Sequence, residues 1–220
     1  MRKFFAVNIL LAVLCGCSST RQYTSQTKTS KITSLALIPP ITRINQITDK
    51  SIQQYSPEIS GRTAAETILQ LKKIIPENIT TTDYLVQDLT DTTGELSLFA
   101  EKLHTGDQIN QIIIPKKMLQ KMAETHQDFA LGITQWGYSR TAGNFDKRSD
   151  QGNMLYFATL GSYRYRPYKS AASMAVYIID RKHGNLAFYR KISWVEEPSE
   201  RMIIKLQLDN LISKYLDAES

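Results

Sequence analysis

Two apolar segments joined by a turn constrain the fold of this 220-residue chain more than any other feature. Residues 174–179 (MAVYII) are apolar on both faces, which predicts a central strand of a sheet. After the turn-rich sequence DRKHGN, apolar side chains alternate with more polar ones from Leu186 to Trp194. Because a period of two is typical of a strand with one buried face, the two segments predict an antiparallel hairpin.

Other strand patterns lie on the N-terminal side of this hairpin. Residues 32–38 predict a short buried strand, and residues 129–134 predict another. In the second of these, the small residues Ala130, Gly132 and Thr134 form one face, so we expect a helix to pack closely on it. The residues between Pro40 and Tyr55 are interpreted as a polar loop. Less regular patterns indicate one further strand and two helical pieces, at residues 79–86, 94–103 and 115–125.

Two amphipathic helices complete the pattern. The sequence Ser56-Pro57-Glu58 is typical of a helix start, with a capping hydroxyl, proline in the first turn and an acidic residue after it. Its expected core stripe is Ala64, Ile68, Leu71 and Ile75. A final helix after Pro198 has the stripe Ile204, Leu208, Leu211, Ile212 and Tyr215. This order of elements predicts a single α/β domain over residues 32–218, with helices packed on a mixed sheet.

The N-terminus has the charge and length of a secretory signal. The positive start MRK is followed by eleven residues, 4–14, in which only Asn8 interrupts the apolar side chains. A transmembrane helix needs about 20 apolar residues, so a spanning anchor is a poorer interpretation. The segment therefore predicts export from the cytoplasm.

The signal ends in Leu14-Cys15-Gly16-Cys17, which resembles the lipobox of bacterial lipoproteins. The resemblance implies that Cys17 carries a diacylglyceryl group, that the signal peptide 1–16 is removed, and that the new amino group is acylated. Cys15 departs from the more usual Ala or Ser, and as the modified residue it would place the bulky Leu14 at the cut. The alternative is an ordinary signal peptide that contains two small cysteines.

Residues 17–31 are predicted to be the lipidated cysteine and a flexible tether. The sequence SSTRQYTSQTKTSK buries too little surface to fold, because it is rich in Ser, Thr and Gln and nearly free of apolar side chains. Ser18, where lipoproteins retained at the inner membrane tend to have Asp, resembles the outer-membrane default. The expected partner of Cys17 is therefore the lipid bilayer, reached through its acyl chains, with the folded domain in the periplasm.

Charge and motifs argue against nucleic-acid binding and catalysis. Beyond residue 16 the chain has 25 basic and 21 acidic residues, a small excess spread along the sequence. The three histidines have no metal-ligand spacing, and neither a nucleophile elbow nor a phosphate-binding loop occurs. Glu196-Glu197 is interpreted as negative charge before the last helix rather than as a glycosidase pair, and the acidic residues near Asp88 match no calcium loop. We expect no enzyme, no metal and no cofactor.

The body resembles a superfamily of periplasmic lipoproteins. The residues concerned are the first strand with its prolines (LALIPP), the strand DFALGITQWGYSR, and the hairpin AVYIIDRKHGNLAFYRKISW with Asp180 and Gly184 at its turn. This superfamily includes the curli secretion channel subunit, the lipoprotein activators of penicillin-binding proteins and the amino-terminal domain of the Tol-system propeller protein. The resemblance spans residues 32–217 and implies a non-enzymatic fold that binds envelope proteins or assembles with itself. Residues 143–170 depart from the resemblance, because their length and composition match no single member of the superfamily.

Within that departure, NMLYFATLGSYRYRPYK mixes aromatic and cationic side chains. Three interpretations stay open: a long loop packed on the sheet, a protein interface in which Tyr and Arg are favoured, and a membrane-inserted hairpin. The candidate partner-contact residues are Tyr156, Phe157, Tyr163, Arg164, Tyr165, Arg166 and Tyr168.

The sequence thus predicts an outer-membrane lipoprotein with a non-enzymatic binding or assembly module in the periplasm. Its partner is an unidentified envelope protein or a second copy of the chain. Two alternatives are an oligomeric secretion-channel subunit and a hydrolase of cell-wall glycan.

Overall fold

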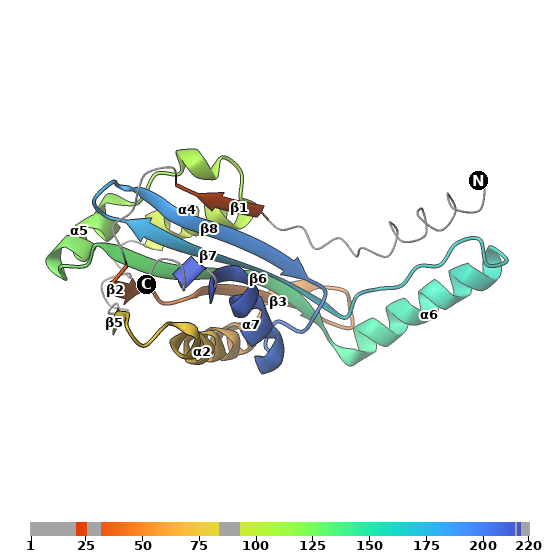
Figure 1. Cartoon of the computed structure of the whole chain (residues 1–220). Helices are drawn as coiled ribbons and strands as arrows, with labels where there is room; N and C mark the ends of the chain where they lie inside the picture. Colours follow the sequence, from red (N-terminus) through yellow and green to blue (C-terminus); the bar gives the residue numbers. More distant parts are fainter. Residues whose placement is uncertain (1–20, 26–31, 84–92, 214, 217–220) are drawn as a thin grey trace, which may run out of the picture.

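In a computed structural model of the chain, one mixed sheet of eight described strands has helices on both faces (Figure 1). The prediction of a single α/β domain with helices packed on a mixed sheet is confirmed. The signal peptide and Cys17 lie outside the described residues. The structure describes residues 21–25, 32–83, 93–213 and 215–216.

Strand β6 organises the sheet because it pairs on both sides. It is antiparallel to β7 and parallel to β2 and then β3, which lie one after the other along its second edge. The strand order is β1-β8-β7-β6-β2-β5, and β4 pairs with β3. The strands are β1 (Arg21–Thr24), β2 (Ser34–Leu37), β3 (Ile41–Ile47), β4 (Gln53–Tyr55), β5 (Thr80–Asp83), β6 (Phe129–Arg140), β7 (Ser170–Asp180) and β8 (Asn185–Trp194).

Helices α2 and α7 lie on one face of the sheet and α4 and α5 on the other, so two apolar cores flank it (Figure 1). Leu131 and Val176 point into the first core, and Ala130 and Tyr177 into the second. Among the described residues, no helix is both long and apolar enough to cross a membrane. The helices are α2 (Pro57–Ile74), α4 (Thr93–Thr105), η1 (Ile109–Gln111), α5 (Lys116–Glu124), α6 (Ala142–Ala158), α7 (Arg201–Leu208) and the π-helical turn η2 (Asp209–Ser213).

The predicted hairpin is confirmed as β7 and β8, which are antiparallel with Asp180 opposite Asn185. Gly184 in the turn has φ 65°, a left-handed conformation that glycine adopts without steric cost. Both long strands extend beyond their predicted bounds, since β6 continues to Arg140 and β7 already begins at Ser170.

The start of α2 is as predicted, because the Ser56 hydroxyl accepts a hydrogen bond from the backbone N–H of Ile59. Its core face is more polar than the apolar stripe suggested. Leu71 is buried, whereas Ala64 and Ile68 are only half-buried. The other buried side chains of the helix are Ser60, Thr63, Thr67 and Gln70.

Hydrogen bonds to the sheet explain this polar face. The Ser60 hydroxyl accepts from the backbone N–H of Ile44 in β3 at 3.0 Å. The Thr67 hydroxyl donates to Oε1 of Gln135 in β6, also at 3.0 Å. Each pair satisfies polar groups that burial would otherwise penalise, so α2 is positioned by polar contacts as well as by apolar packing.

The expectation that a helix packs closely on the small face of β6 is confirmed, since α4 lies against β6 as well as against β7; at Gly132 itself, the ring of Tyr177 lies over the strand. A Cβ atom on Gly132 would lie 2.3 Å from the ring carbon Cζ. The Tyr177 ring in turn packs edge-on against Phe99 of α4, with centroids 5.5 Å apart. The small residue thus makes room for a large neighbour within the sheet, and the helix contacts that neighbour.

Two segments interpreted as irregular form strands. Arg21–Thr24, placed by the sequence within the flexible tether, pairs antiparallel with β8 as β1. The supposed polar loop before Tyr55 contains β3 and β4. Strands β1 and β3 pair with β8 and β6, which are distant in sequence, and local composition does not reveal such pairing.

Candidate functional site: a projecting helical arm

Residues 141–169, called the arm below, connect the end of β6 to the start of β7 and extend away from the body (Figure 1). The arm consists of α6 and a return segment, residues 159–169. The Thr141 hydroxyl caps the helix by accepting from the backbone N–H of Asn144 at 3.3 Å. The helix is followed by Leu160 and Gly161 in left-handed conformations. The sequence contains these start and end signals, but none of the three interpretations of the segment included a helix.

A buried asparagine forms the root of the arm. The side chain of Asn144 is fully buried, and its Nδ2 donates to the carbonyl oxygen of Thr48 at 2.8 Å and to the Ser51 hydroxyl at 3.1 Å. Its Oδ1 accepts from the guanidinium of Arg140 at 2.8 Å. The first turn of α6 is therefore fixed to the connection between β3 and β4.

Backbone contacts at the root hold the return segment as well. The backbone N–H of Arg140 donates to the carbonyl oxygen of Lys169 at 2.9 Å. The Nε of the same arginine donates to the carbonyl oxygen of Tyr168 at 3.0 Å. On the other side, the Thr141 hydroxyl donates to the carboxylate of Asp49. Both ends of the arm are thus joined to the sheet by hydrogen bonds.

The return segment runs back along α6 in close contact with it. A Cβ atom on Gly152 would lie 2.2 Å from the carbonyl oxygen of Tyr165, so the two chains touch at that level. Nearer the far end of the arm, the backbone N–H of Gly161 donates to the carbonyl oxygen of Tyr156 at 2.8 Å. The guanidinium of Arg164 lies 5.7 Å from the centroid of the Tyr156 ring. The arm is thus a helix with the return segment packed along it.

The far end of the arm exposes large apolar side chains. Met154 is 71% exposed, Phe157 74% and Leu160 95%. Of the sixteen large hydrophobic side chains that are exposed among the described residues, half lie between positions 154 and 168. The interpretation that this segment packs onto the sheet is therefore wrong.

The seven candidate contact residues all lie in the arm and are all exposed. Tyr156 and Phe157 belong to the last turn of α6, and the other five belong to the return segment. Sequence reasoning did not include Met154 and Leu160 in this set, although both are in the same apolar run MLYFATL. The arrangement places the set on one projecting element.

Charge is distributed unevenly along the arm. Residues 151–169 contain three cations, Arg164, Arg166 and Lys169, and no acidic residue. Residues 141–150, which include the root, carry two acidic and two basic side chains. The exposed apolar end is therefore accompanied by positive charge only.

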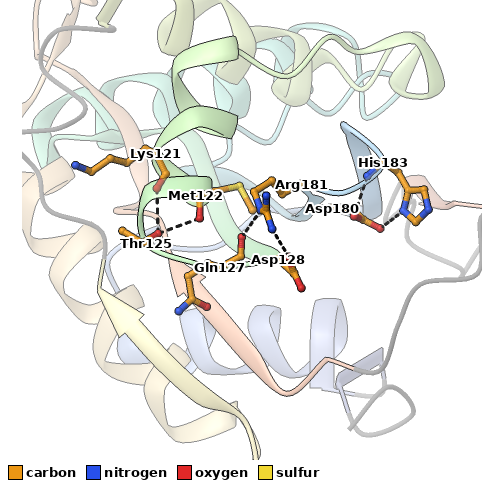
Figure 2. A network of polar contacts seen from close by, with 8 residues as sticks. All are labelled: Lys121, Met122, Thr125, Gln127, Asp128, Asp180, Arg181 and His183. Atoms are coloured by element: carbon orange, nitrogen blue, oxygen red, sulfur yellow. Dashed lines mark hydrogen bonds and ion pairs between the residues drawn. The ribbon is translucent and has the colours of Figure 1, made fainter.

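Figure 2 shows a polar network near the hairpin turn. The backbone N–H of His183 donates to Oδ1 of the buried Asp180, and the His183 ring lies 2.6 Å from Oδ2. Arg181, which follows Asp180 in the sequence, pairs with Asp128 at 2.5 Å and donates to the carbonyl oxygen of Gln127. These contacts tie the end of β7 to the residues just before β6.

The other histidines serve packing and turns. The His104 ring stacks on Trp136 with centroids 4.5 Å apart. Burial, and then the charge of Lys191, lower the pKa of His104 to about 4, so the ring is neutral at physiological pH. His126 lies in the turn after α5 with φ 54°.

The acidic residues form contacts rather than a paired site. A carboxylate oxygen of Glu197 accepts from the Ser139 hydroxyl at 3.0 Å, which ties the segment after β8 to β6. Glu95 lies on α4, whereas Asp88 and Asp91 lie outside the described residues. Within the part of the chain that the structure describes, no three His, Cys, Asp or Glu residues are grouped to hold a metal ion.

Comparison by sequence yields no relative. No protein-family model matches the chain, and no curated protein matches it either.

Comparison with solved structures yields weak similarities. The PelC dodecamer from Paraburkholderia phytofirmans is 7% identical, with a TM-score of 0.42 over 90% of this chain and 96% of that one. The LpoB C-terminal domain from Salmonella enterica is 11% identical, with a TM-score of 0.31 over 77% and 87%. The lipoprotein GNA1162 from Neisseria meningitidis is 10% identical, with a TM-score of 0.34 over 81% and 95%. The chain is thus weakly similar to these three bacterial proteins, one of which is a lipoprotein, and a likeness of this degree assigns neither a family nor a function.

Proposed function

We propose that the chain is an outer-membrane lipoprotein, anchored through acyl chains on Cys17, whose periplasmic domain is a non-enzymatic binding or assembly module. The arm is its contact element. The observation that carries this proposal is the exposed apolar end of an arm that is itself fixed firmly at its root.

The energetics of the arm support a contact role. Burying one Phe, Leu or Met side chain contributes about 1.5–3 kcal/mol, and the fold leaves Met154, Phe157 and Leu160 largely in water. Concentrations of exposed apolar side chains mark interaction sites in soluble domains. The hydrogen bonds at the root keep this end away from the two cores of the body, so its apolar surface is available to another molecule.

The sequence supports an acyl anchor on Cys17, and the short separation of Cys17 from β1 supports a position of the sheet edge close to the bilayer. Cys17 precedes Arg21 by four residues, which span at most about 14 Å when fully extended. The tether beyond β1 is therefore short, and an acylated Cys17 would keep the sheet edge formed by β1 and β8 close to the bilayer.

The anchor is tested by labelling cells with an alkyne analogue of palmitate. We expect the chain to be labelled and Cys17→Ser to lose the label, while Cys15→Ser keeps it because residue 15 is removed with the signal peptide. An unlabelled wild-type chain, or equal labelling of Cys17→Ser, would contradict lipidation.

The contact role is tested with a photo-crosslinking amino acid at position 157 in living cells. Position 69 on α2 is the matched control, because Leu69 is also an exposed apolar side chain but lies on the body. We expect adducts of defined mass at position 157 that weaken in Tyr163→Ala/Tyr165→Ala. Adducts equal to those at position 69 would remove the arm as the contact element, and adducts to a second copy of the chain would identify self-association.

A further inference from the structure

We propose that the end of the arm inserts into the headgroup layer of an anionic bilayer. Here "tip" means residues 153–163. This inference rests on the proposed function, because it names the partner of the same contact element. It adds a second, non-covalent attachment beside the acyl chains of Cys17.

The first argument is the direction in which α6 is amphipathic. A helix that lies flat on a protein or a membrane has one polar side and one apolar side along its length. Instead, α6 is polar over its first part (AGNFDKRSDQGN) and apolar over its last turn (MLYFA). Its polarity therefore changes along the axis, which suits a helix whose end enters an apolar layer.

The second argument is that the apolar side chains surround the helix end. At about 100° per residue, the four consecutive side chains of residues 154–157 point in four directions around the helix axis, and all four are exposed. Leu160 extends this surface beyond the last turn. A flat protein partner would cover one side of such an end, whereas fluid lipid can cover every side.

The third argument is the composition of the segment behind the tip. Tyr163 and Tyr165 alternate with Arg164 and Arg166 in the return segment, and Lys169 follows near the root. Tyrosine rings and snorkelling cations are the side chains that favour the interface between headgroups and acyl chains. With three cations and no acidic residue in 151–169, the charge complements anionic headgroups.

The dimensions agree with shallow insertion. The carbonyl of Tyr165 contacts α6 at Gly152, six residues before the last helical residue, Ala158. Six residues of helix span about 9 Å, and amphipathic elements insert about 5–10 Å into the boundary of headgroups and acyl chains. When the apolar end is immersed, the first arginine–tyrosine pairs thus lie at headgroup level.

The position of the anchor agrees as well. Arg21 lies opposite Lys191 and Thr24 opposite Phe188, so the chain comes to β1 from the end of the sheet at which the arm is rooted. Four residues separate Cys17 from Arg21, so the anchor can be at most about 14 Å from the end of β1 that faces the arm. A single bilayer that holds the acyl chains and receives the tip would fix the inclination of the domain.

The test uses the lipidated mature chain reconstituted in vesicles. Cys17 is then blocked by lipid, so Leu160→Cys supplies the thiol for an environment-sensitive fluorophore, and Leu69→Cys supplies a matched exposed control on the body. In vesicles of phosphatidylcholine with phosphatidylglycerol, we expect a blue shift and quenching by nitroxide lipids at position 160 and neither at position 69. Equal signals at the two positions would overturn the proposal.

Charge and apolarity are separated by two further variants of the labelled chain. Arg164→Gln/Arg166→Gln/Lys169→Gln is expected to lower the ratio of inserted to free tip at position 160 on the order of a hundredfold in anionic vesicles, and to have little effect in vesicles of phosphatidylcholine alone. Met154→Ser/Phe157→Ser is also expected to lower the inserted fraction in anionic vesicles, because the end of the arm then gains less from immersion. Unchanged insertion in both variants would overturn the proposal. Because all five side chains are exposed, an unchanged melting temperature serves as the folding control.

The result is independent of the proposed function. If position 160 stays in water in vesicles while position 157 crosslinks to one envelope protein in cells, the lipid contact is overturned and the binding module stands. If the chain carries no palmitate label, Cys17→Ser/Leu160→Cys replaces the lipidated chain in the vesicle test; quenching at position 160 then keeps the lipid contact and overturns the anchor alone.

Discussion

The body and the tip of the arm treat apolar side chains in opposite ways. In the body, Leu131 and Ile178 are fully buried between the sheet and its helices. At the tip, Phe157 and Leu160 are mostly exposed, although they stand on a helix that is firmly hydrogen-bonded at its root. The difference teaches that burial within the domain explains the first set and does not explain the second, for which the proposed contact outside the chain supplies a role.

Truncation of apolar side chains is the largest expected contrast between the two regions. Leu131→Ala should lower the free energy of unfolding by about 3–4 kcal/mol, because it opens a cavity in a packed core. Leu160→Ala should change it by less than about 0.5 kcal/mol. Urea unfolding of both variants checks this. A comparable loss in Leu160→Ala would mean that the tip packs on the body in solution.

Two glycines should give the next contrast, since each touches a neighbour too closely for a Cβ atom. Gly132→Ala should lower the free energy of unfolding by about 2 kcal/mol, because the buried Tyr177 ring must move. Gly152→Ala should loosen the return segment at Tyr165 while leaving the body intact. Hydrogen exchange by mass spectrometry should then be faster in residues 159–168 alone. Faster exchange throughout β6 and β7 in Gly152→Ala would contradict this separation.

The root should behave like the body although it belongs to the arm. Asn144→Ala leaves the carbonyl of Thr48 and the guanidinium of Arg140 without their buried partner. We expect a loss of about 1–2 kcal/mol in the free energy of unfolding. Asn153→Ala, at an exposed position of the same helix, is the control and should be neutral. Equal thermal stability of the two variants would show that the root is not held through Asn144.

The smallest expected effect is a pH dependence confined to the body. Because the pKa of His104 is lowered from 6.5 to about 4, the unfolded chain binds more protons than the folded one between these values. The contribution of His104 to the free energy of unfolding is fully present above pH 6.5 and is lost as the pH falls toward 4. The loss is about 1 kcal/mol after allowance for partial solvation of the ring. In His104→Gln, the urea midpoint should depend less on pH between 6.5 and 4.5 than it does in the wild type. Parallel pH profiles would contradict the neutral stacked ring.

Much of the body was predictable from local patterns. Alternation and turn residues identified β7 and β8, and Ser56-Pro57 identified the start of α2. The pairing of β3 with β6 was not predictable, because the isoleucines of β3 recur at every third residue instead of every second and its partner lies far away in sequence. The same holds for β1, which is stabilised by the edge of β8 rather than by its own composition.

The arm was only half predictable. The mixture of tyrosines and arginines marked residues 156–168 as unusual. Its helix was missed because α6 lacks the apolar stripe from which surface helices are recognised. That stripe is absent for a physical reason, since α6 has no sheet to cover and carries its apolar side chains at one end.

Methionine oxidation tests the central claim, that the apolar tip is open in the chain itself and covered by an anionic bilayer. Met154 and Met202 are similarly exposed, on the tip and on α7 respectively, while Met174 is buried in the core. Peptide mass spectrometry of the lipidated chain on vesicles of phosphatidylcholine, treated with peroxide, should find Met154 and Met202 oxidised at similar rates and Met174 protected. Adding phosphatidylglycerol should slow oxidation of Met154 alone. Equal rates for Met154 and Met202 on the anionic vesicles would contradict the account.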